Sequence, residues 1–147
     1  MKSSACCAKT ATYTLSSSKV VTARSGYQYR CVVKNAKGSV TSDAISLTVI
    51  PQRPVILTQP ASVTVSAGTP VTFRVEAKGE NLKYQWYYRT GPNASWSKST
   101  AACAKTPVYE RSSEDVTLKR NGYEYRCVVM NEGGAVTSEA AVLHVQK

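Results

Sequence analysis

The chain repeats itself at an offset of 96 residues, and no other feature constrains its fold as strongly. The stretch Ser25–Val33 returns as Asn121–Val129, and the same offset joins Gly38 to Gly134 without a gap. A period of this length corresponds to one small domain rather than to one unit of a solenoid. The sequence therefore predicts a tandem array of small domains.

The two copies of the repeat differ in length. Residues 53–147 hold a complete copy, whereas residues 1–50 match only the C-terminal half of one, so we interpret the first copy as truncated. Two prolines in the segment 51–54 fix the backbone and resist strand pairing, which indicates a short, stiff linker. We expect residues 53–147 to fold alone and residues 1–50 not to do so.

The apolar residues of the complete copy follow the period of β-strands. Val71, Phe73 and Val75, for example, are separated by polar or charged residues, as in a strand with one buried face. Turn-forming residues separate about seven such stretches, and we find no long run with apolar residues at helical spacing. The prediction is an all-β chain whose complete copy is a two-sheet sandwich.

Three motifs of the complete copy resemble those of immunoglobulin-like (Ig-like) domains. They are Val71–Val75, Tyr84–Tyr87 and Gly122–Cys127, and they resemble more narrowly the tandem Ig-like repeats of Gram-positive bacterial cell-surface proteins. The resemblance covers nearly all of residues 53–147. It implies an Ig-like β-sandwich, preceded by a half-copy that lacks strands A, B and C.

The resemblance also implies roles for residues of the core, which are Phe73, Val75, Trp86, Tyr125 and Cys127. Trp86 corresponds to the strand-C tryptophan, and Tyr125 to the strand-F tyrosine corner, whose hydroxyl bonds to nearby backbone. Val75 stands where such domains usually carry the disulfide partner of Cys127, so that bridge is absent. Cys127 is expected to pack as a free thiol, with a Cys103–Cys127 bridge as the alternative.

The sequence offers little for catalysis or for metal binding. His144 is the single histidine, and no serine, cysteine or carboxylate has an evident base or an opposed acid beside it. The five cysteines lack the spacing of zinc or redox motifs. We therefore expect no enzyme activity, no catalytic residue, no metal and no cofactor.

Two aromatic residues are candidates for ligand contact. The strand alternation directs Tyr87 outward, and Trp96 follows it across a hairpin. Outward aromatic rings on a sandwich can stack on sugars, which makes a carbohydrate-binding module the alternative function. The interpretation that we favour is that Trp96 covers Tyr87 or the sheet edge as a cross-strand pair.

The chain is basic, with a net charge of +10, and residues 1–50 carry seven basic and one acidic side chain. Such a charge attracts polyanions, although it also describes an ordinary soluble surface. We expect no nucleic acid partner, because Tyr29 and Tyr125 should face inward while Arg30 and Arg126 face outward.

The sequence also limits the location of the protein. It has no apolar run of the ~20 residues that a membrane helix needs, so no membrane insertion is expected. The segment Met1–Cys7 is not a secretory leader, and the half-copy favours a fragment of an exported protein. The predicted location is extracellular or at the cell surface, and the predicted function is a non-catalytic spacer or adhesion module with a protein or glycan partner.

The half-copy raises a physical problem of its own. Inward residues such as Tyr29, Cys31 and Val33 would lack a facing sheet, which leaves an apolar patch and a free strand edge. Three outcomes stay open: a truncated chain, completion by another chain through strand exchange, and partial disorder. The second would produce self-association through the half-copy.

Overall fold

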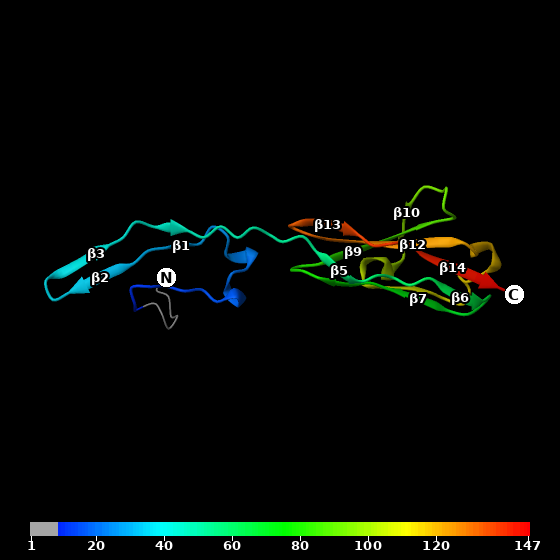
Figure 1. Ribbon diagram of the computed structural model, residues 1–147, viewed down its shortest axis with the longest axis horizontal. Helices are drawn as coiled ribbons and strands as arrows, with labels where there is room; N and C mark the ends of the chain where they lie inside the picture. The colour runs from blue at the N-terminus through cyan, green and yellow to red at the C-terminus, as the bar shows by residue number, and fades with distance from the viewer. Residues whose placement is uncertain (1–8) are drawn as a thin grey trace. The chain divides into compact units, whose positions relative to one another are not determined.

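The structure is a computed structural model that describes residues 9–147, and strands dominate it (Figure 1). The all-β prediction is therefore confirmed. The chain divides into two compact units, Met1–Pro51 and Gln52–Lys147. None of the helices among the described residues is long and apolar enough to cross a membrane.

The larger sheet of the second unit has six strands. Its order is β10 (Ser97–Lys98), β9 (Lys83–Arg89), β12 (Tyr123–Asn131), β14 (Ala141–Gln146) and β6 (Val63–Ser66), with β13 (Gly134–Thr137) also paired to β12. Strands β9 and β12 are antiparallel over seven residue pairs. Strands β14 and β6 are parallel over four.

Two pairs of strands form the opposite layer. Strand β7 (Val71–Arg74) pairs with β11 (Val108–Arg111), and β8 (Glu76–Lys78) pairs with β5 (Val55–Thr58). The N-terminal segment of the complete copy thus contributes to both layers, because β5 belongs to one layer and β6 to the other. The chain crosses between them at Pro60, which is buried and cannot donate a ladder hydrogen bond. Short 3-10 helices, η3 (Ala102–Lys105) and η4 (Leu118–Arg120), complete the connections.

The core of the second unit lies between these layers and is rich in aromatic rings. Phe73, Val75, Trp86, Tyr125 and Cys127 each have at most 1% of their surface exposed. The Phe73 and Tyr125 rings stack at 4.7 Å, and the indole N–H of Trp86 donates to the Thr106 carbonyl at 2.9 Å. The indole therefore buries its large apolar surface without leaving its polar atom unpaired.

One expectation drawn from the resemblance is wrong, and one about Cys127 is confirmed. The buried hydroxyl of Tyr125 has no hydrogen-bond partner among the described residues, so the tyrosine-corner bond to backbone is not formed. Cys103 and Cys127 are both free thiols, which rules out the bridge between them. Cys127 packs instead as a small apolar side chain.

The first unit repeats the local structure of the second without its core. Its elements are η1 (Ser17–Lys19), η2 (Thr22–Arg24), β1 (Gln28–Tyr29), β2 (Val32–Asn35), β3 (Gly38–Thr41) and β4 (Ile45–Ser46). Strand β1 pairs with β4, and β2 pairs with β3. None of residues 9–51 is buried, although β2 and β3 lie 96 residues before parts of β12 and β13.

Candidate functional site

The outward face of the larger sheet carries the aromatic residues that the sequence singles out. On β9 and β12, Arg126 lies opposite Tyr87, and Glu124 lies opposite Arg89. Lys98 of β10 lies on the other side of Tyr87, so Lys98 rather than Trp96 is its cross-strand neighbour on that side. Tyr87 and Trp96 are therefore not directly opposite each other, and Trp96 packs instead against Arg126, the neighbour of Tyr87 on β12.

Trp96 is covered by two arginine side chains. The guanidinium carbon of Arg126 lies 4.2 Å from the centre of the Trp96 ring, and that of Arg89 lies 4.7 Å from it. Arg89 also donates two hydrogen bonds to the nearly buried Glu124 carboxylate, at 2.6 and 2.9 Å. The arginines are thus held both by the ring and, for Arg89, by an opposite charge.

This packing bears on the proposed carbohydrate site. A sugar stacks on an aromatic ring whose face is open to solvent, and here guanidinium groups already occupy the tryptophan. Tyr87 is half-buried between its neighbouring strands. The contacts form a cation–π cluster at the hairpin end of the sheet, in which the partly buried Trp96 ring packs on Arg89 and Arg126.

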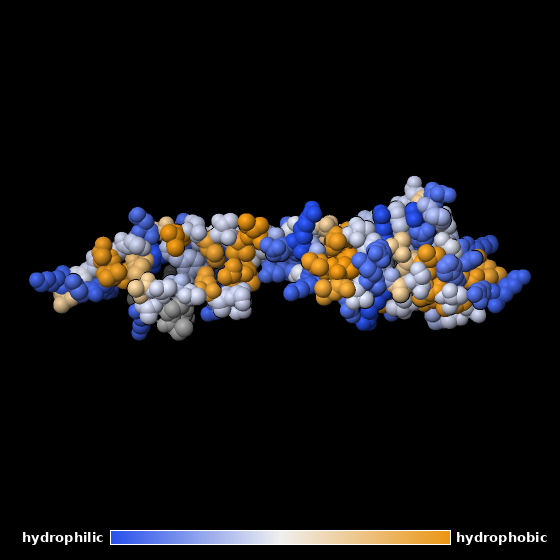
Figure 2. All heavy atoms as spheres, viewed as in Figure 1, coloured by the Kyte–Doolittle hydropathy of each residue, from blue (hydrophilic) through white to orange (hydrophobic). Residues whose placement is uncertain are grey.

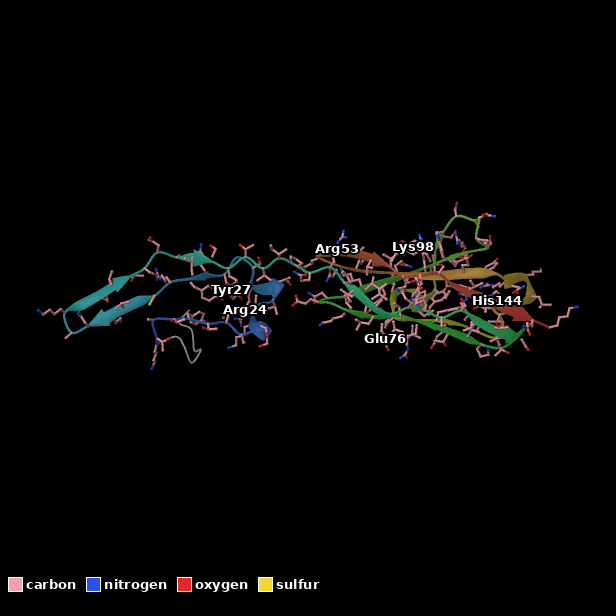
Figure 3. All side chains as sticks on the ribbon, in the orientation of Figure 1. Arg24, Tyr27, Arg53, Glu76, Lys98 and His144 are labelled. Carbon is pink, nitrogen blue, oxygen red and sulfur yellow. The ribbon has the colours of Figure 1, made fainter. Side chains whose placement is uncertain are left out.

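The described residues show no cluster that could hold a metal ion, because no three His, Cys, Asp or Glu side chains gather closely enough within residues 9–147. His144 is exposed on β14 opposite Thr64 (Figure 3). Burial raises the pKa of the Cys127 thiol to about 12, which keeps it protonated and unreactive near neutral pH.

A shallow depression of about 310 Å³ lies where β7 meets β8. Its walls come from Arg74, Val75, Glu76, Ala77, Tyr84, Pro107 and Val108. Arg74 and Glu76 bring opposite charges to it, and the rest of its lining is largely apolar. We therefore assign no activity to this depression.

The turn between β12 and β13 holds the linker that precedes the second unit. The Asn131 side-chain amide donates to the carbonyls of Gln52 and Glu80, at 2.9 and 3.1 Å. A Cβ at Gly133 would lie 2.5 Å from the Gln52 carbonyl carbon, so only glycine lets the linker approach this closely. The sequence indicated a turn at these glycines, but it gave no sign of the contact with a linker some 80 residues earlier.

The chain has relatives in two very different organisms. It is 37% identical over 123 residues to Endoglucanase C from Cellulomonas fimi, a match that covers 83% of this chain and 11% of that protein. It is 29% identical over 122 residues to Peroxidasin from Drosophila melanogaster, with 78% of this chain and 7% of that protein covered. The chain thus spans about a tenth of the length of these relatives. No model of a known protein family matches it.

Solved structures share the fold more widely than the sequence. The titin domains Z1Z2 in complex with telethonin align with a TM-score of 0.55 at 22% identity, covering 85% of this chain and 62% of that one. Sidekick-1 immunoglobulin domains 1–5 align with a TM-score of 0.54 at 21% identity, covering 86% and 26%. These likenesses confirm the Ig-like β-sandwich, and at this identity they establish the fold alone.

Proposed function

We propose that the complete copy is a non-catalytic Ig-like spacer module of a bacterial extracellular protein. The observation that carries this proposal is the position of the two ends of the second unit. The chain enters beside Arg53 at one end of the sandwich and leaves at the other, beyond β14 (Figures 1 and 3). Because the chain enters and leaves at opposite ends of the sandwich, each such module adds its full length to a tandem array.

The strand pairing suits a module that bears tension. Strand β6 lies near the start of the unit and β14 at its end, and the two are parallel neighbours. A pull on the ends slides one strand along the other, which loads their hydrogen bonds together rather than one at a time. The bond from the Ala67 N–H to the Gln146 carbonyl, at 2.9 Å, continues this series.

The match to a bacterial protein supports the part of the proposal that places the module in a longer bacterial protein. Endoglucanase C is named for an enzyme activity, and the matched segment is a small part of it. We propose that the present module separates functional regions of a longer exported protein, and that Gram-positive cell-surface proteins are one such class. Adhesion to a protein or glycan would be a second role of the same module.

Pulling the full chain from both ends in an optical trap tests the spacer function. We expect one cooperative unfolding event from the second unit, releasing roughly 30 nm of chain. The Ala67 bond and the strand period of two direct the Val65 N–H toward β14 and the Thr64 N–H away from it. Val65→Pro should therefore lower the unfolding force much more than Thr64→Pro, because proline is tolerated on the free side of an edge strand.

Two outcomes would overturn the proposal. One is extension of the chain without a discrete unfolding step, because a spacer under tension must stay folded until a threshold force is reached. The other is an equal loss of force in both proline variants, which would show that the β6–β14 bonds do not carry the load.

A further inference from the structure

The backbone of the half-copy makes the same hydrogen bonds as the matching half of the complete copy. Equivalent hydrogen bonds occur in both units at nearly the same length. They are Cys31 N–H to Ser42 Oγ and Cys127 N–H to Ser138 Oγ, each 2.9 Å, and Gly26 N–H to Leu47 O and Gly122 N–H to Leu143 O, each 2.8 Å. The sequence repeat is therefore also a structural repeat.

An aromatic contact is shared as well. The Tyr13 and Tyr29 rings lie 5.5 Å apart with an interplanar angle of 36°. The equivalent Tyr109 and Tyr125 rings lie 5.6 Å apart at 42°. The side chains that line one half of the sandwich core are thus already positioned in the half-copy.

The two units differ in what covers this face. Val129 is fully buried, whereas its equivalent Val33 is 61% exposed, and the exposed Cys31 corresponds to the fully buried Cys127. Ile45, at 70% exposure, is equivalent to a buried alanine of β14. Hydrophobic residues accordingly appear on the surface of the first unit in Figure 2.

The complete copy shows what occupies the equivalent face. Strand β9 pairs with β12 from Glu124 to Met130, and its Trp86 fills the core. From the other layer, Phe73 stacks on Tyr125. Both come from residues 53–98, and all but the last two of these residues have no counterpart in residues 1–50.

We propose that the face formed by β1–β4 is a preformed binding site for a polypeptide segment with the residue pattern of 53–98. The segment would add a strand to the edge of β1 and β2 and would place a tryptophan and a phenylalanine over Tyr29 and Cys31. This binding is separate from the spacer function, which belongs to the second unit. It requires no rearrangement of the half-copy's own hydrogen bonds.

The net charges of the two segments should affect the affinity of their complex. Residues 1–50 carry a net charge of +6, and residues 53–98 carry six basic and two acidic side chains. The two segments therefore repel at long range, while apolar burial attracts them. Added salt screens this repulsion, so it should strengthen the complex rather than weaken it.

Thiol accessibility provides a direct test on the full chain. The chain would carry Cys6→Ser, Cys7→Ser and Cys103→Ser, which leaves Cys31 and Cys127 as the reporters. The probe is a synthetic polypeptide of residues 53–98, which contains no cysteine. At saturating probe, we expect alkylation of Cys31 to slow by about tenfold or more, while Cys127 stays protected throughout.

The matched control is the same probe with Trp86→Ala, which lacks the side chain that fills the core. Protection of Cys31 by the unaltered probe but not by this control supports the proposal. Unchanged alkylation of Cys31 overturns it, as does equal protection by both probes, which would indicate unspecific apolar association. Weaker protection in high salt would contradict the predicted electrostatics and the proposed complex with them.

Discussion

At the scale of single residues, two core tyrosines with similar burial should respond differently to the loss of their hydroxyl groups. The Tyr109 hydroxyl bonds to the buried Ser99 at 2.7 Å and accepts from Arg111 at 3.1 Å. The Tyr125 hydroxyl has no partner among the described residues. Burial raises the pKa of Tyr125 above its usual value, and the positive charges of Arg111 and of Arg120, which approaches the hydroxyl, offset this only in part.

We therefore predict that Tyr125→Phe leaves the free energy of unfolding unchanged or raises it by up to about 1 kcal/mol, because no hydrogen bond is lost. Tyr109→Phe is the matched control and should cost about 1–2 kcal/mol, since it leaves Ser99 without this bond. Urea denaturation of both variants measures the difference. A larger loss for Tyr125→Phe than for Tyr109→Phe would show that the Tyr125 hydroxyl is bonded after all.

At the scale of elements, the turn between β12 and β13 fixes the linker. We predict that Gly133→Ala displaces Gln52 and Arg53, because the added methyl group would overlap their backbone at 2.5–2.8 Å. Gly91→Ala is the control, since its methyl group would meet no atom within 4 Å. Backbone ¹⁵N relaxation should report faster motion of Gln52 and Arg53 in the first variant alone. Equal linker dynamics in both variants would mean that the close approach does not restrain the linker.

Strands and their faces could be predicted from the sequence because both depend on local alternation. The pattern of Val71, Phe73 and Val75 places all three in the core, where the structure finds them. The partners of side chains depend instead on the register between distant strands. Trp96 lies under Arg126 because β9 and β12 align, and Asn131 reaches Gln52 because a turn meets a linker. No local pattern in the sequence contains that information.

At the scale of the whole molecule, the two units differ in whether the repeat encloses a core. The same residue type at the same repeat position is fully buried in one unit and mostly exposed in the other, as with Val129 and Val33. If cooperative stability resides in the second unit, the calorimetric enthalpy of unfolding should correspond to its 96 residues, Gln52–Lys147. That is about 70 kcal/mol, against about 100 kcal/mol for the full chain.

A pair of substitutions separated by one repeat period tests this division most sharply. Val129→Asp puts a carboxylate into a closed apolar core, which costs several kcal/mol, so it should abolish the unfolding transition of the second unit. Val33→Asp makes the same change where the side chain is 61% exposed, so it should leave the midpoint and the enthalpy unchanged. Scanning calorimetry of the two variants beside the parent chain measures both effects. A lowered midpoint in Val33→Asp would show that the half-copy contributes to the stability of the complete one, and that the repeat is cooperative across its linker.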